Sequence, residues 1–270
     1  MLQETCIGKN SCCHYELSDI KTTQNGLIYF PKYFLEDYYI DYFEQKSIPY
    51  TTLKKNVYVD SKNITWEDLY LIKTESYSSL NWYSYLEQYT YKSEFIPITS
   101  FHDLKNINIT FPKFIKLDTV SAKDTNHNGI FYSSQELLNV FERSSRILNT
   151  MSSKRLTHES HCLFIREPDY FINIEVRCFV YNRRLVAVST DIFINQDQKN
   201  ILTTFINTII EDMPYYDAVA DVCIYEDNSC KLIEINNYGA DSPAGAGNFN
   251  WKDDYFLLYG GYDEVVWNIN

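Results

Sequence analysis

Two polar residues late in the chain have the types and spacing of ligands for a hard metal ion. Glu234 and Asn236 stand two residues apart, in and directly after the apolar run of residues 232–235. Such a run indicates a buried strand. Because side chains alternate between the faces of a strand, both point to the same side. A carboxylate and an amide oxygen side by side form half of a site that magnesium takes when it also holds nucleotide phosphates.

A third oxygen donor lies just upstream. Asp221 stands in the middle of a second apolar run, residues 218–225, and the turn-rich residues 226–229 separate the two runs. This pattern predicts an antiparallel hairpin that can bring Asp221 near Glu234 and Asn236. A buried carboxylate needs a partner, because an unpaired charge inside a protein costs several kcal/mol. The alternative is that Asp221 is a hydrogen-bonded core acid and Glu234 faces solvent.

Three cations earlier in the chain have the character of phosphate ligands. Lys116 lies inside the strand-like residues 113–117, so its ammonium must either reach solvent or meet an anion. Lys123 follows in a loop of small polar residues. Arg177 lies in a strand, where its forked guanidinium suits a phosphate or a carboxylate. The competing interpretations are solvated lysines on an edge strand, and a structural pairing of Arg177 with an acid.

Short strands and helices alternate around these groups. A capping-box pattern at Ser133–Glu136 opens an amphipathic helix that we expect to run to about Asn149. An Asn182-Arg183 turn indicates a hairpin. Strands are expected at 56–60, 95–97, 113–117, 161–166, 174–181, 185–190, 218–225 and 232–235, and further helices at 31–45, 65–70, 79–88 and 202–210. The sequence thus predicts an α+β fold, and it contains neither a P-loop nor a dinucleotide fingerprint.

Composition excludes several classes of protein. The net charge is −12, from 24 basic and 36 acidic residues, which argues against a general nucleic-acid grip. Hydrophobic residues make up 45% of the chain, enough for a sizeable core. The number of cysteines, 7, is odd, and Cys162, Cys178, Cys223 and Cys230 lie in apolar or strand-like runs, as reduced core cysteines do. The N-terminus does not resemble a signal peptide and no apolar run is long enough to span a membrane, so we expect a cytoplasmic protein with no membrane partner.

The order of the segments resembles the ATP-grasp superfamily and, within it, the cell division cycle protein 123 family. The matching segments come in that family's order and cover about residues 80–255. They are W-Y-x-x-L-x-x-x-T-x-K-S-x-x-I-P at 82–97, F-P-K-F-I-K-L at 111–117, S-A-K-D at 121–124, I-R at 165–166, E-V-R-C-F-V at 175–180, Asp221, E-I-N-N-Y-G at 234–239 and F-N-W at 249–251.

The resemblance implies an ATP-grasp fold of two α+β lobes with antiparallel sheets that grip ATP, and a role for each matched residue. Lys116 would contact the α and β phosphates, with Ser121 and Lys123 in the loop that closes over them. Arg177 would also face the phosphates. The adenine would be bordered by Phe164, Ile165 and Arg166. Magnesium would be held by Asp221, Glu234 and Asn236, although the family usually carries Asp where this chain has Glu234.

The expected domains are an N-terminal extension of unknown role (1–80), an N-terminal ATP-grasp lobe (81–160) and a C-terminal lobe with the metal site (161–270). Members of the family bind ATP and act in assembly of eukaryotic translation initiation factor two by binding its gamma subunit. The resemblance therefore implies a Mg-ATP-binding assembly chaperone. The alternative is an ATP-dependent carboxylate–amine ligase that acts on a protein or peptide through an acyl phosphate, with Arg177 as the best catalytic candidate and residues 239–248 as a mobile substrate loop. A third possibility is a degenerate scaffold that binds no nucleotide.

Overall fold

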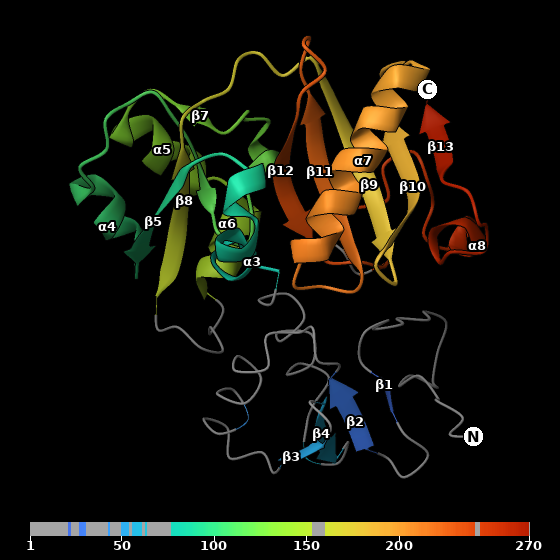
Figure 1. Ribbon diagram of the computed structural model, residues 1–270. Helices are drawn as coiled ribbons and strands as arrows, with labels where there is room; N and C mark the ends of the chain where they lie inside the picture. Colours follow the sequence, from blue (N-terminus) through green and yellow to red (C-terminus); the bar gives the residue numbers. More distant parts are fainter. Residues whose placement is uncertain are drawn as a thin grey trace. The chain divides into compact units, whose positions relative to one another are not determined.

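The computed structural model describes residues 77–152, 160–240 and 244–269 continuously and, before them, four short strands, Phe43 and Asn63. The chain divides into two compact units, Tyr77–Phe171 and Met1–Ser76 with Ile172–Asn270. Each is described by itself. Figure 1 gives the elements and their labels.

The unit Tyr77–Phe171 is built on a four-stranded antiparallel sheet with the strand order β5-β8-β6-β7. Its strands are β5 (Ser93–Ile98), β6 (Lys113–Leu117), β7 (Ile130–Phe131) and β8 (His161–Arg166). Its helices are α3 (Ser79–Leu86), η1 (Glu87–Tyr89), α4 (Phe101–Asn106), η2 (Lys123–Thr125), α5 (Ser134–Phe141) and α6 (Ser145–Ser152). Because β8 pairs with both β5 and β6, it lies in this sheet, whereas the expected domain boundary at residues 160–161 assigns it to the other lobe.

One face of this sheet packs against helices. Ile115, Leu117, Leu163 and Ile165 share a buried cluster with apolar residues of α4, α5 and α6. Since neighbouring side chains on a strand point to opposite faces, Lys116 and Phe164 lie on the other face. The apolar alternation of β6 and β8 therefore decides which of the candidate site residues can share a surface.

The helix expected from Ser133 to about Asn149 is two helices. The predicted cap is present, because Ser133 Oγ accepts a hydrogen bond from the Glu136 N–H at 3.2 Å. However, α5 ends at Phe141 and α6 begins at Ser145. The carboxylate of Asp124 accepts hydrogen bonds from the Ser145 hydroxyl and the Arg146 N–H, so it satisfies the orphan donors of a new helix start. The prediction of one continuous helix was wrong because this cap comes from a distant part of the chain.

The second unit contains a five-stranded sheet with the strand order β12-β11-β9-β10-β13. Its strands are β9 (Ile174–Tyr181), β10 (Arg184–Thr190), β11 (Ala218–Ile224), β12 (Cys230–Asn236) and β13 (Val266–Ile269). All pairs are antiparallel except the parallel pair β10–β13. The two predicted hairpins, β9–β10 and β11–β12, are confirmed. At the first turn Asn182 and Arg183 both have positive φ, as a tight hairpin turn requires.

Two groups of apolar residues cover this sheet. Helix α7 (Gln196–Asp212) lies across one face (Figure 1). Of the apolar stripe that the sequence predicts to be core, Leu202, Ile206, Ile209 and Ile210 are buried and Phe205 is half-buried. The other face carries Phe179, Tyr238 and Phe249, near the short helix α8 (Tyr255–Leu258). The candidate residues of β9, β11 and β12 lie on this second face.

Four strands before residue 77 form a separate antiparallel sheet with the order β1-β2-β4-β3. They are β1 (Lys21–Thr22), β2 (Leu27–Phe30), β3 (Tyr50–Leu53) and β4 (Asn56–Asp60). The strand expected at 56–60 is thus confirmed, while the helices expected at 31–45 and 65–70 lie outside the described residues. The predicted α+β class with antiparallel sheets in both lobes is also confirmed. Within the part of the chain that the structure describes, no helix is long and apolar enough to cross a membrane.

Candidate functional site

A row of polar residues crosses the five-stranded sheet in register. Ser189 is paired with Arg177, Arg177 with Asp221, and Asp221 with Glu234. On the outer side of β10, Asn268 of β13 is paired with Ser189. Residues that are directly opposite on neighbouring strands point to the same face and lie within contact distance. Pairing thus brings together groups that are scattered over ninety residues of sequence, or about a third of the chain.

Arg177 and Asp221 form a forked ion pair in the middle of this row. Arg177 Nε donates to Asp221 Oδ1 at 2.8 Å, and Nη2 donates to Oδ2 at 2.9 Å. The side chains are 17% and 4% exposed, respectively. Burial lowers the pKa of Arg177, but the hydrogen bonds and charge of Asp221 and the charges of Glu234 and Glu175 outweigh it, so the pKa lies above its ordinary value. The structural pairing of Arg177 with an acid, which the sequence offered as the competing interpretation, is present, and the acid is Asp221.

Glu234 and Asn236 complete the predicted donor set. Asn236 Nδ2 donates to Asp221 Oδ2 at 3.3 Å. The register between β11 and β12 shifts after Asp221, between the pairs Asp221–Glu234 and Val222–Leu232. A bulge of this kind re-aims side chains locally. It leaves Glu234 directly opposite Asp221, and both acids on the face that carries Arg177.

The chemistry of these donors fits a magnesium ion. Two carboxylates and one amide are oxygen donors of the kind that magnesium prefers. Asp221 Oδ2 accepts from both Arg177 and Asn236, whereas Oδ1 accepts from Arg177 and keeps a second lone pair for a metal. In the regions that the structure describes, no group of three or more His, Cys, Asp or Glu side chains is placed to hold a metal. A metal on this face would therefore be held by the two carboxylates together with an amide oxygen.

The loop of residues 244–248 lies against Arg177 and Ser189 of the row. Arg177 Nη1 donates to the carbonyl oxygen of Ala244 and, at 3.4 Å, to that of Gly245. The Asn248 N–H donates to Ser189 Oγ at 2.8 Å. In the ligase alternative, residues 239–248 are a mobile substrate loop, but the described residues 244–248 are tied to β9 and β10 by these bonds.

The other group of candidate residues lies on the unit Tyr77–Phe171. Lys116 is only 5% exposed, and its Nζ lies 5.4 Å from the centre of the Phe164 ring. Register pairs the two residues directly across β6 and β8. A lysine ammonium over an aromatic face gains a cation–π interaction, and more so where water is excluded. Lys116 therefore belongs to the buried cation class that the sequence predicts rather than to solvated edge lysines.

The three residues expected to border adenine do not share one environment. Phe164 is 1% exposed and makes edge contacts with the rings of Phe95 and Tyr83, at centroid distances of 5.4 and 6.4 Å. Arg166 lies between the rings of Tyr91 and Phe114, each 4.1 Å from its guanidinium carbon.

Ile165 points the other way, into the cluster with the helices. Since its side chain is used in the core, only its backbone is left to meet a ligand on the face of Phe164. The assignment of all three residues to the adenine remains a prediction.

The loop that carries Ser121 and Lys123 is anchored. Lys123 is exposed and Ser121 is half-buried. Asp124 accepts hydrogen bonds from Ser144 Oγ at 2.5 Å and from Ser145 Oγ at 2.8 Å. Burial raises the pKa of Asp124, but the hydrogen bonds from Ser144, Ser145 and the Arg146 N–H outweigh it and lower the pKa to about 2. The sequence motif S-A-K-D thus contains one residue, Asp124, whose contacts hold the loop in place.

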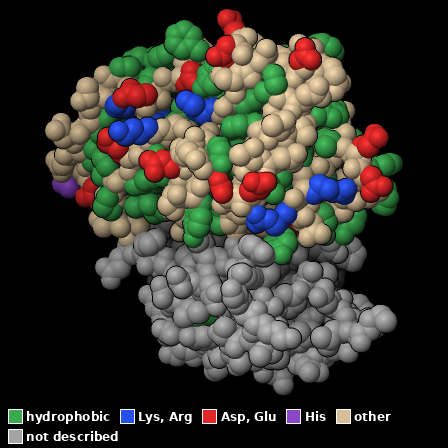
Figure 2. All heavy atoms as spheres, viewed as in Figure 1, with side chains coloured by type: hydrophobic (Ala, Val, Ile, Leu, Met, Phe, Trp, Pro, Cys, Tyr) green, Lys and Arg blue, Asp and Glu red, His purple; other side chains and the backbone are tan. Residues whose placement is uncertain are grey.

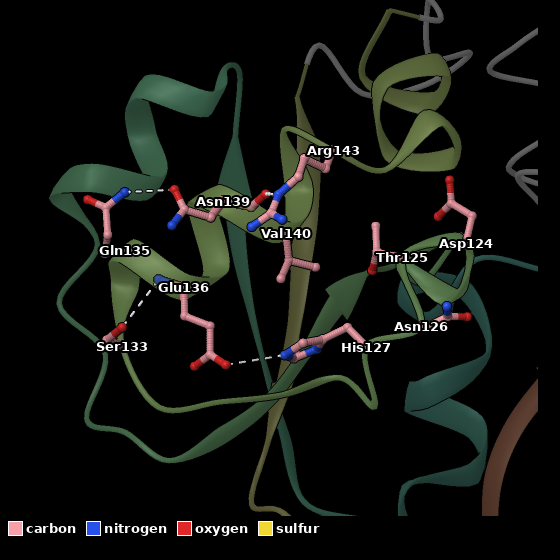
Figure 3. A pocket seen from close by; sticks show the side chains of 10 residues that line it. All are labelled: Asp124, Thr125, Asn126, His127, Ser133, Gln135, Glu136, Asn139, Val140 and Arg143. Atoms are coloured by element: carbon pink, nitrogen blue, oxygen red, sulfur yellow. Dashed lines mark hydrogen bonds and ion pairs between the residues drawn. The ribbon is translucent and has the colours of Figure 1, made fainter.

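A polar groove of about 690 Å³ begins where this loop ends (Figure 3). His127 Nε2 lies 3.4 Å from Glu136 Oε1, and His127 Nδ1 accepts a hydrogen bond from the Gly129 N–H at 3.0 Å. The ring is stacked on Phe131 with centroids 4.4 Å apart. Sequence reasoning did not single out this groove. It is lined by Asp124, Thr125, Asn126, His127, Ser133, Gln135, Glu136, Asn139, Val140 and Arg143.

The residues that sequence reasoning missed lie at the edge of the polar row. Ser189, Asn248 and Asn268 are joined by hydrogen bonds that span 59 and 20 residues of sequence. Neither spacing nor local pattern marks such contacts. The prediction of core cysteines is confirmed for Cys162, Cys178 and Cys223, which are buried, whereas Cys230 is half-buried. Charged side chains of both signs are interspersed on the face drawn in Figure 2, without a broad basic patch among the described residues.

Comparisons with known proteins add sequence and fold similarity. No family model matches the chain. A CDC123-like protein of Acanthamoeba polyphaga mimivirus is 26% identical in an alignment 300 positions long that covers 88% of this chain and 92% of that protein. The structure of Cdc123 from Schizosaccharomyces pombe is similar with a TM-score of 0.57 and 19% identity, over 74% of this chain and 97% of that one. A weaker likeness, with a TM-score of 0.44 and 13% identity over 75% of this chain and 70% of the other, is to a RimK domain ATP-grasp protein of Sphaerobacter thermophilus.

The sequence similarity extends over nearly the whole chain, and the fold similarity covers nearly all of the yeast Cdc123 structure. The two comparisons agree with each other and with the order of motifs in the sequence. The chain is therefore similar in sequence to a CDC123-like protein over most of its length, and its fold is similar to that of yeast Cdc123.

Proposed function

We propose that this protein binds ATP together with magnesium and serves as an ATP-loaded assembly chaperone for the gamma subunit of translation initiation factor two. The observation that carries the nucleotide part is the polar row. Arg177, Asp221 and Glu234 lie side by side on three strands, and Asn236 is bonded to Asp221. Acidic oxygen donors next to a forked cation are what a phosphate with its metal requires.

Each residue of the row has a role in this proposal. Asp221, Glu234 and Asn236 would hold magnesium, which supplies positive charge for the phosphate oxygens. Arg177 uses Nε and one N–H of Nη2 on Asp221, and directs Nη1 to the carbonyl oxygens of Ala244 and Gly245, so the second N–H of Nη2 would be its donor to a phosphate oxygen. Because Asp221 accepts from both Arg177 and Asn236, one carboxylate orients the cation and the amide together.

Lys116, in the unit Tyr77–Phe171, is included in the proposal because the resemblance implies that it contacts phosphates. Its ammonium is held next to the Phe164 ring, on the face of the sheet opposite the cluster with α4, α5 and α6. A phosphate oxygen is a strong acceptor for a lysine in surroundings of low dielectric constant. The exposed Lys123 on its anchored loop adds a second cation.

The chaperone part of the proposal depends on the resemblance to the family. Members of that family act in assembly of the translation factor, so the resemblance implies the same role here. The contacts of Arg177 favour binding over catalysis. In the described arrangement its donors already reach Asp221 on one side and two carbonyl groups on the other. An arginine that stabilises a transferring phosphate must be free to follow the developing charge.

Calorimetry with ATP and magnesium tests the nucleotide part. We expect binding to the wild-type protein, strict dependence on magnesium, and loss of binding in Lys116→Ala and Asp221→Asn. Lys105→Ala and Asp197→Asn are matched controls, because both residues are exposed on helices outside the candidate residues. Glu234→Gln provides a milder second test of the metal site, since Glu234 is less buried than Asp221. Absence of any heat with millimolar ATP and magnesium would refute the proposal.

Two further assays separate the chaperone from the ligase. A chaperone should retain ATP and capture the purified gamma subunit, and Asp221→Asn should weaken that capture. A ligase should release ADP and phosphate when it is offered an amine acceptor and a carboxylate substrate. Turnover without capture of the gamma subunit would replace the chaperone by the ligase while leaving the nucleotide proposal intact.

A further inference from the structure

Asn248 ties a loop to two strands of the five-stranded sheet through three hydrogen bonds. Its N–H donates to Ser189 Oγ at 2.8 Å, and its Nδ2 donates to the Thr190 carbonyl oxygen at 3.0 Å. Its own carbonyl oxygen accepts from Asn268 Nδ2 at 3.0 Å. The side chain of Asn248 is thus bonded to β10, and its backbone is bonded to both β10 and β13.

Gly247, the residue before Asn248, has the backbone geometry that these three hydrogen bonds require. Gly247 has a φ of +60°, and a Cβ at this position would lie 2.4 Å from Ser189 Oγ. A side chain here would strain the backbone and also push Ser189 away from the Asn248 N–H. The close approach of the loop to β10 therefore depends on glycine at this position.

The same loop holds one side of Arg177. The carbonyl oxygens of Ala244 and Gly245 accept from Nη1, while Asp221 accepts from Nε and Nη2. A guanidinium is planar and presents its donors in a fixed fork. Acceptors on both sides therefore fix its plane as well as its direction.

We propose that Asn248, together with Ser189 and Asn268, is a positioning residue for Arg177. By tying the loop to β10 and β13, it sets where the carbonyl groups of Ala244 and Gly245 lie, and these set the plane of the guanidinium above the sheet. The last strand, β13, becomes part of the site through Asn268, although it bears none of the predicted ligands. The inference rests on the proposed function only for the ligand, Mg-ATP, that the oriented Arg177 would meet.

Apolar contacts hold the loop on the sheet independently of Asn248, so the proposed positioning role differs from simple attachment of the loop. Ala246 and Phe249 lie on either side of Gly247 and Asn248. Their side chains are 9% and 8% exposed and belong to the cluster with Phe179 and Tyr238. Their burial keeps the loop on the sheet without Asn248, since buried apolar area is the main favourable term in folding. Removal of the Asn248 side chain breaks the Nδ2 bond to Thr190 and leaves the two backbone bonds, so it should leave the fold intact and loosen the orientation of Arg177.

Asn248→Ala tests the inference with two readouts. The Arg177 Nε–H signal in a ¹⁵N–¹H NMR spectrum, assigned by its loss in Arg177→Lys, reports the hydrogen bond to Asp221 directly. We expect this signal to shift in Asn248→Ala, to exchange with water about tenfold faster, and the Kd for Mg-ATP to rise by about tenfold, the effect of roughly one well-oriented hydrogen bond. Asn200→Ala, an exposed asparagine on α7, should change neither readout.

The outcomes are distinguishable. An unchanged Nε–H signal in Asn248→Ala overturns the positioning role, whereas a changed signal with unchanged affinity overturns the expectation that the orientation of Arg177 contributes to binding Mg-ATP. If Asn248→Ala does not fold, Ser189→Ala, which removes the acceptor of the Asn248 N–H, is read in the same way. If the wild-type protein binds no Mg-ATP, the proposed function fails, while the Nε–H signal alone still decides whether Asn248 orients Arg177.

Discussion

The Arg177–Asp221 pair allows a quantitative test of how the polar row is built. Replacing Arg177 by Met leaves a carboxylate that is 4% exposed without its forked partner. Replacing Asp221 by Asn leaves a guanidinium that is 17% exposed and that keeps the carbonyl oxygens of Ala244 and Gly245 as acceptors. The two variants should therefore differ in stability, although they break the same pair.

The expected free-energy changes follow from burial. Removing one partner of a buried ion pair destabilises a protein by about 3–5 kcal/mol. The cost is larger when the partner left behind is the more deeply buried one. We therefore expect Arg177→Met, which leaves Asp221 unpaired, to lower the free energy of unfolding by about 4–5 kcal/mol. Asn at position 221 still accepts one neutral hydrogen bond, worth about 1 kcal/mol, so Asp221→Asn should cost about 2–3 kcal/mol. The double variant strands no charge, and its destabilisation should fall short of the sum by about 2 kcal/mol or more.

Urea unfolding at pH 7, followed by circular dichroism, measures all four proteins. The comparison requires equal m values, because a change in m indicates a change in the unfolded state rather than in the pair. The reasoning is refuted if the double variant equals the sum of the single variants to within about 0.5 kcal/mol, since that result means that the two side chains do not interact. It is also refuted if Asp221→Asn is the more destabilising of the two single variants.

Three further predictions concern the surroundings of the row and the anchored loop. Gly247→Ala should destabilise the protein by about 1–3 kcal/mol, measured by the same urea titration, because its φ is +60° and its Cβ would lie 2.4 Å from Ser189 Oγ. The pKa of Asp124, lowered to about 2, means that this carboxylate stabilises the fold above its ordinary pKa of 3.8 and that the contribution is lost as pH falls through about 2. Thermal unfolding between pH 5 and pH 2 should therefore show a smaller pH dependence in Asp124→Asn than in the wild-type protein. Burial raises the pKa of the Cys230 thiol to about 11, so its alkylation by iodoacetamide at pH 7.5 should be slower than that of a free cysteine of ordinary pKa.

Each of these has a control on the same chain. Gly245→Ala also places a side chain at a positive φ, but nothing lies within 4 Å of its Cβ, so it should be the milder of the two glycine variants. Ser145→Ala, which removes one hydrogen bond to Asp124, should reduce the pH dependence in the same direction as Asp124→Asn. Alkylation of Cys230 at the rate of glutathione would contradict the assigned burial of the thiol.

Periodicity and turn residues predicted most of the second sheet. The hairpin around Asn182-Arg183 and the hairpin that holds Asp221, Glu234 and Asn236 both follow from apolar runs separated by turn-forming residues. Alternation along β6 and β8 likewise placed Lys116 on a strand with apolar neighbours. These features are local, so a short window of sequence contains all the information that they need.

Contacts between distant segments escaped prediction for the opposite reason. The helix after Ser133 was expected to continue to Asn149, but Asp124 caps a new helix at Ser145. The pairing of Arg177 with Asp221 was one of several possibilities, because a strand sequence does not state which strand will lie beside it. Register, which depends on the packing of the whole sheet, made that choice.

The amino-acid sequence alone determined the α+β class, the elements that carry the candidate residues, and the chemical types that suit a phosphate and a metal. The tertiary structure decided which of those residues share a face, because side-chain direction alternates with every residue and partners come from strands far apart in the chain. In the folded protein the side chain of Ile165 points into the core, and Arg177 is paired with Asp221. Ser189, Asn248 and Asn268 lie together at the edge of the row. Those last three residues have no local signal, because their only connection is the hydrogen bonds that the folded sheet creates.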